Sequence, residues 1–326
     1  MSTIDLCREF YLSEAAPMIR MCFPDYEHRI AAGIAGEGSD CFGYDDEISK
    51  DHDFGIGVCL WLTDEDYDRI GKELDEAYRG LIAGTMDNND CLTWNPRLNA
   101  RRGVLRISDY YQGLLRVRFD IDTPSMTDSQ WFSADEKGIA AAVNGEVFRD
   151  DLGKFSNIRN MLLAFYPDKV MKMKLVNALH GFAGAWQANY PRCMARKDYV
   201  AAHHCISVGM EEAMKIVFFL EHRYMPYYKW SYRALSDMSE ASGRTDLKEL
   251  TELIGRAALI QVQSDAWESY RYDPVSINTE DELVNAGEEI ANVIAGMLRK
   301  NGLSNSRETF LEIQCEIGRA SCRERV

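Results

Sequence analysis

The feature that most constrains this chain is the segment of residues 36–62, GEGSDCFGYDDEISKDHDFGIGVCLWL. The small-residue pair Gly38-Ser39 is followed, after eleven residues, by Asp51-His52-Asp53 at the start of an apolar run. Residues two apart in a strand point to the same face, so the two carboxylates are predicted to lie side by side. Two negative charges about 4 Å apart repel by about 4 kcal/mol at an effective dielectric constant of about 20. A divalent cation usually offsets such repulsion, so this pattern predicts a metal site.

The glycine-serine pair predicts a phosphate site next to the metal site. A turn without bulky side chains brings backbone N–H groups close to a phosphate, which makes Gly38 and Ser39 candidate nucleotide-binding residues. Lys50 directly precedes the acidic pair and is a candidate for neutralising phosphate charge. Phosphate and metal together predict nucleotidyl transfer.

These residues resemble a known superfamily. The order Gly-Ser then Asp-x-Asp at this spacing is similar to the nucleotidyltransferase fold of the polymerase β superfamily. The string GSDCFGYDDEISKDHDFG resembles a narrower bacterial branch known as a domain of unknown function. WFSADEKGIAAAVNGEVFRDDLGKFSNIRNMLLAFYPDKV at 131–170 and FLEHRYMPYYKW at 219–230 are similar to the same branch. The resemblance covers residues 10–235. It implies Mg²⁺- or Mn²⁺-dependent transfer of NMP from an NTP, expected to be ATP, to a hydroxyl acceptor with release of pyrophosphate.

The superfamily generally carries a third carboxylate on a neighbouring strand. LLRVRFDID at 114–122 alternates as a strand would, with Asp120 and Asp122 on its polar face. We favour Asp120 as the third catalytic and metal-binding residue, because Asp122 abuts the loop before Pro124. Asp122 stays open as the alternative.

A second candidate cluster lies in the C-terminal half, where aromatic residues alternate with cations. Arg223, Tyr227 and Lys229 surround the helix-breaking Pro226. In the functional interpretation, Arg223 and Lys229 approach phosphate or substrate, and Tyr227 or Trp230 stacks on a ring. Arg223, Lys229 and Tyr227 are therefore candidate nucleotide-binding residues. In the structural interpretation, the segment is a helix end packed on its neighbours.

Composition limits the classes of partner. The net charge of −15 makes a polynucleotide substrate unexpected, because nucleic-acid binders usually present a basic face. Such a charge would suit a cationic acceptor, although it does not locate a cleft. Nine cysteines without a CxxC pair predict reduced thiols. With neither an apolar run of membrane-spanning length nor a signal pattern, we expect a cytoplasmic protein without a membrane partner.

The pattern of elements predicts an α+β fold: a mixed-sheet nucleotidyltransferase domain followed by an all-helical bundle domain. We predict a catalytic domain over 1–130, a helical domain for substrate or partner over 131–304, and a disordered or non-native tail over 305–326.

Two functions remain open. The first is the metal-dependent nucleotidyltransferase, with a small molecule favoured as the acceptor. The alternative is a toxin–antitoxin-like or regulatory module that modifies or binds a protein partner. The base preference and the oligomeric state are not readable from the sequence.

Overall fold

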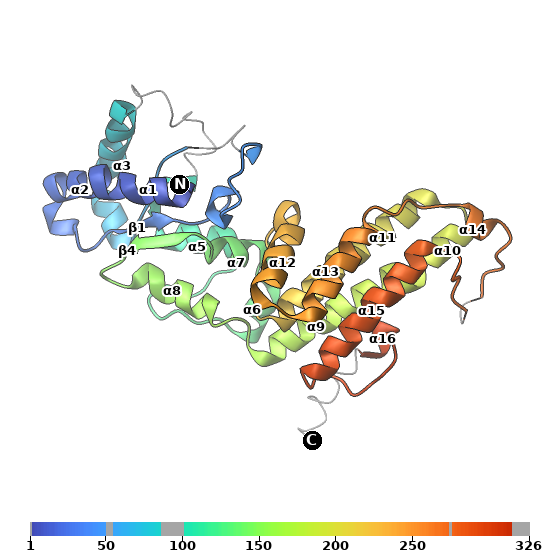
Figure 1. Ribbon diagram of the computed structural model, residues 1–326. Coiled ribbons are helices and arrows are strands. Elements are labelled where there is room, and N and C mark those ends of the chain that lie inside the picture. Colours follow the sequence, from blue (N-terminus) through green and yellow to red (C-terminus); the bar gives the residue numbers. More distant parts are fainter. Residues whose placement is uncertain (1, 50–54, 86–100, 274–275, 315–326) are drawn as a thin grey trace, which may run out of the picture. The chain divides into compact units, whose positions relative to one another are not determined.

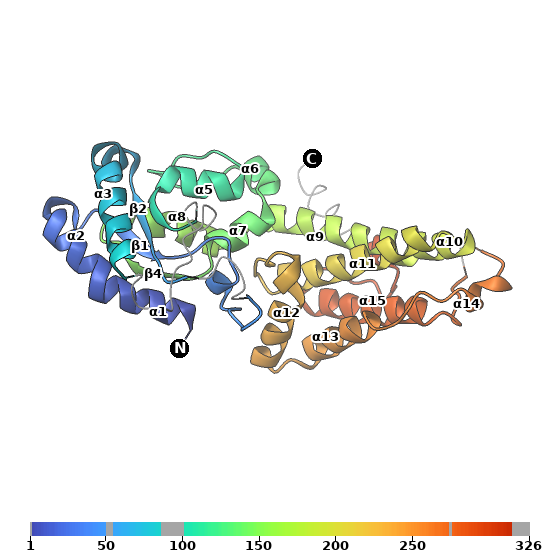
Figure 2. The same cartoon turned by 90° about the horizontal axis from the view of Figure 1, so that it is seen from above.

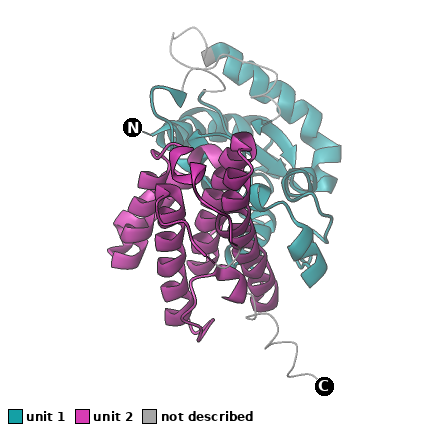
Figure 3. Ribbon diagram, turned by 90° about the vertical axis from the view of Figure 1, so that its right-hand side faces the viewer, with its two compact units in different colours: residues 1–166 teal, residues 167–326 magenta. Residues whose placement is uncertain are grey.

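The computed structural model describes residues 2–49, 55–85, 101–273 and 276–314. The chain divides into two compact units, residues 1–166 and residues 167–326 (Figure 3). The first unit contains the sheet and the second is helical, so the predicted α+β class is confirmed.

Unit 1 combines short strands with helices (Figure 1). Its elements are α1 (Thr3–Phe10), the π-helical segment η1 (Tyr11–Ala15), α2 (Ala16–Cys22), η2 (Pro24–Tyr26), β1 (Ala31–Ile34), η3 (Asp40–Phe42), β2 (Cys59–Leu62), α3 (Asp64–Thr85), β3 (Gly103–Arg106), α5 (Ile107–Leu115), α6 (Asp128–Ser133), α7 (Glu136–Ala142), β4 (Glu146–Arg149) and α8 (Lys154–Leu163).

The four strands form one mixed sheet in the order β3-β2-β1-β4. β1 pairs antiparallel with β2, with Gly33 opposite Cys59, and also antiparallel with β4. β2 pairs in parallel with β3, with Cys59 opposite Gly103. The C-terminal end of β1 therefore meets the N-terminal ends of β2 and β3 at one edge of the sheet.

Helices cover both faces of this sheet (Figure 1). On one face, side chains of α1, η1, α2 and α3 pack on Leu60 and Leu62. On the other face, Trp61 stacks on Phe155 of α8 with ring centroids 3.8 Å apart and contacts Tyr110 of α5. The alternation along β2 directs successive side chains into the two layers.

Two predictions for unit 1 require correction, one about its C-terminal boundary and one about a strand. The division between the units falls after Tyr166 rather than at residue 130, because β4 joins the sheet and α8 covers it. The predicted strand at 114–122 is wrong. Its first two residues end α5, Arg116 adopts a left-handed conformation with φ +60°, and the following residues 117–122 form no strand.

Unit 2 is built from helices, several of which run side by side (Figure 2). Its elements are α9 (Asp168–Phe182), the π-helical segment η5 (Ala183–Asn189), α10 (Tyr190–Ala195), α11 (Tyr199–Leu220), α12 (Tyr228–Ser242), α13 (Thr245–Ala257), α14 (Asp265–Glu268), α15 (Glu282–Lys300) and α16 (Leu311–Gln314). Among the helices of both units that the structure describes, none has the length and apolar character needed to cross a membrane.

Trp186 lies at the centre of the unit 2 core. Its indole N–H donates a hydrogen bond to the Leu283 carbonyl at 2.8 Å. Gly209 of α11 and Gly287 of α15 lie against its ring, and a Cβ atom at either glycine would approach the ring within 2.6 and 2.7 Å. The small residues thus allow two helices to pack closely on one large side chain.

The predicted tail is ordered where it can be described. Leu311 of α16 is fully buried, its N–H donates to the Gln187 side chain at 2.9 Å, and Gln314 is buried too. The prediction of disorder is therefore wrong for residues 305–314, because α16 carries an apolar side chain into the core. Residues 315–326 lie outside the described part of the chain.

Gly138 allows the close approach of α7 to α5. A Cβ atom there would lie 1.9 Å from the Leu114 carbonyl oxygen, which is backbone and cannot move aside cheaply. We expect Gly138→Ala to lower the free energy of unfolding by about 3 kcal/mol, measured by urea denaturation. Gly80→Ala in α3 is the matched control: its Cβ has open space, so it should stabilise by about 0.5–1 kcal/mol. Equal effects of the two changes would contradict this packing.

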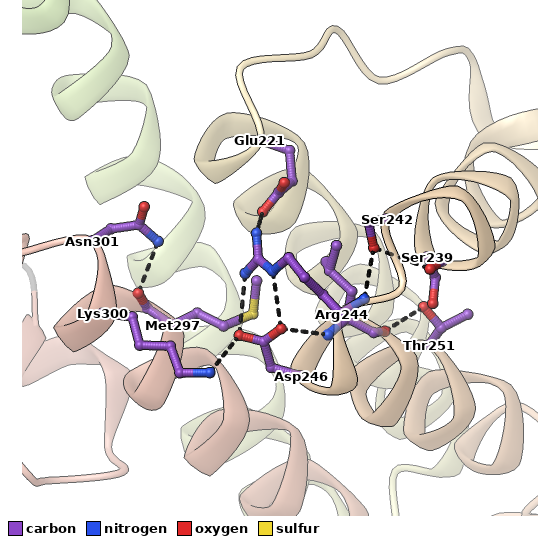
Figure 4. Close-up of polar contacts among 10 residues, drawn as sticks. Glu221, Ser239, Ser242, Arg244, Asp246, Thr251, Met297, Lys300 and Asn301 are labelled. Carbon is purple, nitrogen blue, oxygen red and sulfur yellow. Dashed lines mark hydrogen bonds and ion pairs between the residues drawn. The ribbon is translucent and has the colours of Figure 1, made fainter.

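A charged cluster joins three helix ends of unit 2 (Figure 4). Arg244 donates to Glu221 at 2.5 Å and to both carboxylate oxygens of Asp246 at 3.1 Å. Lys300 at the end of α15 donates to Asp246 at 2.9 Å, and the Asp246 side chain is only 13% exposed. The cluster fixes the α12–α13 turn against α11 and α15.

The hydrogen bond from Arg244 lowers the pKa of Asp246, with Lys300 adding to the effect. A carboxylate with a lowered folded-state pKa stabilises the fold above its unfolded pKa of about 3.9, and this stabilisation is lost as the pH falls toward the folded value. We expect Asp246→Asn to cost about 2 kcal/mol at neutral pH and progressively less below about pH 4, by urea denaturation across that range. Asp237→Asn, which removes an exposed i,i+4 pair with Arg233, should cost less than about 0.5 kcal/mol. A cost that does not change with pH would refute this role of Asp246.

Candidate functional site

The glycine turn follows β1 directly and adopts a conformation that requires glycine. Gly36 has φ +118° and Gly38 has φ +139°, both in the left-handed region that L side chains rarely adopt. A Cβ atom on Gly38 would also lie 2.4 Å from a carboxylate oxygen of Asp40. Ser39 begins the next turn, where its carbonyl accepts from the N–H groups of Phe42 and Tyr44. The turn predicted from Gly38 and Ser39 is thus formed, while its binding of phosphate stays a prediction.

A buried ion pair holds the turn from beneath. Arg102 and Asp40 are 4% and 7% exposed, and the Arg102 guanidinium donates to the Asp40 carboxylate. The same guanidinium donates to the Cys41 sulfur at 3.3 Å, and Asp40 accepts from the Cys41 N–H at 2.8 Å. Burial raises the pKa of Cys41 to about 12, so this thiol stays protonated at neutral pH. Arg102 directly precedes β3, so its side chain links the start of that strand to the turn after β1.

Asn144 holds the same turn from the other side. Its side-chain oxygen accepts from the Gly36 N–H at 2.9 Å, and its amide donates to the Gly36 carbonyl at 2.7 Å. Arg159 in turn donates to the Asn144 carbonyl at 2.8 Å. The two hydrogen bonds from the Asn144 side chain fix the orientation of the Gly36 peptide groups, in the same way as backbone bonds from a neighbouring strand.

Residues 55–58, which follow the predicted acidic pair in the sequence, approach the sheet at the edge where this turn lies. They lead into β2. The Val58 N–H donates a hydrogen bond to the Tyr78 hydroxyl oxygen at 2.8 Å, and the Val58 carbonyl accepts one from the Gly103 N–H at 2.9 Å. Lys50, Asp51 and Asp53 themselves lie outside the described residues. Within the described ranges, no group of three or more His, Cys, Asp or Glu side chains is arranged to hold a metal ion.

Asp120 does not lie on a strand beside β2. The prediction that it is the third catalytic carboxylate depended on such a strand and loses this support. It is an exposed loop residue whose carboxylate accepts from the Thr123 hydroxyl at 2.6 Å and from the Asp122 N–H at 2.9 Å. The bonds from Thr123 lower the pKa of Asp120. Asp122 pairs with Lys154 at 2.7 Å instead. The two strands that neighbour β2 carry no acid: β1 has the sequence AAGI and β3 the sequence GVLR.

A pocket of about 350 Å³ opens beside the glycine turn within unit 1. Gly36 lines it together with residues of β3 and α5 and with three arginines, Arg101, Arg106 and Arg116. The Tyr110 ring forms part of its wall, and burial raises the pKa of the Tyr110 hydroxyl. Sequence reasoning missed these arginines, although RLNARRGVLR is a basic segment on an acidic chain.

The second predicted cluster lies in unit 2, at the connection between α11 and α12. Arg223 is exposed there, and Lys229 places its ammonium 5.0 Å from the centre of the Trp230 ring. The Tyr227 hydroxyl accepts a hydrogen bond from the Trp230 indole at 2.8 Å. These contacts give Tyr227 and Lys229 a packing role at the start of α12, and nucleotide binding by the three residues stays a prediction.

Comparison with known proteins gives two similarities. A family model described as a domain of unknown function, DUF4037, matches residues 131–231. The crystal structure of a nucleotidyltransferase-like protein from Exiguobacterium sibiricum 255-15 is similar with a TM-score of 0.38 and 11% identity, covering 95% of this chain and 80% of that one. No curated protein matches the chain. The family match agrees with the predicted resemblance of residues 131–170 and 219–230 to a family of unknown function, and it does not include the glycine turn.

Proposed function

We propose that this protein is a metal-dependent nucleotidyltransferase that moves NMP from an NTP, expected to be ATP, to a hydroxyl acceptor. The observation that carries the proposal is the glycine turn at the end of β1, held by buried polar contacts at the sheet edge where residues 55–58 enter β2. The Asp51-x-Asp53 pair directly precedes this entry in the sequence. A phosphate-binding turn and a pair of carboxylates at one edge are what this chemistry needs.

The proposed roles follow from the chemistry of each group. Backbone N–H groups around Gly38 and the Ser39 hydroxyl would bind the NTP phosphates, with Lys50 as a further cation. Asp51 and Asp53 would hold Mg²⁺ or Mn²⁺, which when bound would neutralise charge on the phosphates. The acceptor oxygen would form a bond to the α-phosphorus as the bond to the β-phosphate oxygen breaks, so pyrophosphate leaves. The acceptor proton must pass to a base. The loop position of Asp120, the predicted third catalytic residue, does not support it as this base.

The test is transfer of labelled NMP by the full chain. Each of the four NTPs, labelled at the α-phosphate, would be incubated with Mg²⁺ or Mn²⁺ and either a panel of small hydroxyl compounds or a cell lysate. We expect label in a small-molecule product, pyrophosphate release in equal amount, and loss of both on chelation. Label on a protein instead would favour the alternative, a toxin–antitoxin-like or regulatory module, which stays a prediction. Absence of transfer to every acceptor would count against the proposal.

A further inference from the structure

The pocket beside the glycine turn has a charge opposite to that of the chain as a whole. Its lining contains three arginines, Arg101, Arg106 and Arg116, and two acids, Glu37 and Asp109. The chain carries −15. A local excess of guanidinium groups in a concave site attracts an anionic ligand, whatever the net charge of the protein.

Arg106 is held in place as a wall of this pocket. Its guanidinium lies 4.3 Å from the centre of the Tyr67 ring, it is paired with Asp68, and it lies 3.8 Å from Asp109. A guanidinium that is already oriented loses little conformational freedom when a ligand binds beside it. Most of its charge is, however, compensated by these acids.

Arg116 carries the charge that remains available to a ligand. Arg116 is exposed at the end of α5, and no carboxylate lies within ion-pairing distance of it among the residues that the structure describes. Arg101, in contrast, is already paired with Glu37, with 3.7 Å between Nε and the carboxylate oxygen. A phosphate or carboxylate can accept two parallel N–H bonds from the Arg116 guanidinium.

The remaining wall of the pocket is apolar. Val104, Leu105 and Leu114 line it together with the Tyr110 ring. The volume of about 350 Å³ suits a small molecule rather than a polymer. The pocket therefore combines cations at its rim with an apolar and aromatic surface.

We propose that this pocket binds a small ligand that carries a phosphate or carboxylate group on an apolar or aromatic body, with Arg116 holding the anion. The ligand class rests on the local charge, and it differs from the cationic acceptor that the composition alone would suit. Identifying this ligand as the acceptor of the transfer reaction rests on the proposed function. The binding of an anionic ligand in the pocket does not depend on that function. An anion here is either a phosphate group of the NTP or a group of the acceptor.

The test is isothermal titration of the full chain in EDTA with three ligands that share one ring: phenyl phosphate, benzyl alcohol and benzylamine. We expect phenyl phosphate to bind at least about tenfold more tightly than either of the others. Arg116→Gln should weaken phenyl phosphate binding about tenfold. The matched control is Arg118→Gln, an exposed arginine two residues further along that does not line the pocket.

ATP added to protein saturated with phenyl phosphate identifies the source of the anion. Displacement assigns the pocket to the NTP phosphates, and simultaneous binding assigns it to the acceptor; both results support an anion site. Equal affinities for the three ligands, or equal losses with Arg116→Gln and Arg118→Gln, would overturn the proposal. Because the titration needs neither metal nor turnover, its failure is distinguishable from a failure of the transferase assay.

Discussion

Replacing Asp51 and Asp53 together by alanine is expected to reduce NMP transfer by about a thousandfold or more. The two carboxylates are the proposed holders of the divalent cation, and without them the charge that develops on the phosphates has no metal to stabilise it. The measurement is the initial rate of labelled product formation with saturating Mg²⁺. Asp25→Ala is the control, since Asp25 is an exposed acid of the same unit in η2. Its rate should stay within about twofold of the unchanged protein.

The stability of the double variant separates loss of the metal site from loss of the fold. In EDTA, removal of two like charges that are two residues apart in the sequence should leave the melting temperature unchanged or higher. Added Mg²⁺ should raise the melting temperature of the unchanged protein but not that of the variant, because a ligand stabilises only a state that binds it. A variant that transfers NMP at the original rate, or one that still responds to Mg²⁺, would remove Asp51 and Asp53 from the site.

Replacing Arg102 by alanine is expected to lower the free energy of unfolding by about 3–5 kcal/mol. Asp40 is only 7% exposed, and the change removes the guanidinium partner of its carboxylate. A buried charge without a partner lowers the free energy of unfolding far more than the intact ion pair raises it. The change also removes the bond to the Cys41 sulfur, so the glycine turn loses its support from β3. Urea denaturation measures the loss.

The neighbouring arginine is a matched control for Arg102. Arg101 is 32% exposed on its side chain and pairs loosely with Glu37, so Arg101→Ala should cost less than about 1 kcal/mol. In a double-mutant cycle, Arg102→Ala combined with Asp40→Ala should cost clearly less than the sum of the two single changes, because the second change removes the buried charge left by the first. Additive costs would mean that the pair does not act as a unit.

The helices and the glycine turn could be predicted because their signals are local. Spaced apolar residues over 3–20 are typical of a helix, and α1 begins there; the acids after Thr63 are typical of a helix start, and α3 begins there. Gly36 and Gly38 adopt φ values that side chains disfavour, which is why a glycine-rich stretch marks a turn. The strand predicted at 114–122 is absent although apolar and polar residues alternate there, because no neighbouring strand is present among the described residues to pair with this segment.

The sequence by itself determined the α+β class with a helical second part, the sharp turn before Ser39 and the presence of an acidic pair before an apolar strand. Only the tertiary structure decided that Arg102 is buried against Asp40, 62 positions away, because charged residues are usually exposed and burial depends on such a distant partner. It also decided that Arg101, Arg106 and Arg116 line one pocket with Gly36. These residues come together because of the register in which β1, β2 and β3 pair. Strand pairing depends on contacts between residues that are distant in the chain, so it has no local sequence signal.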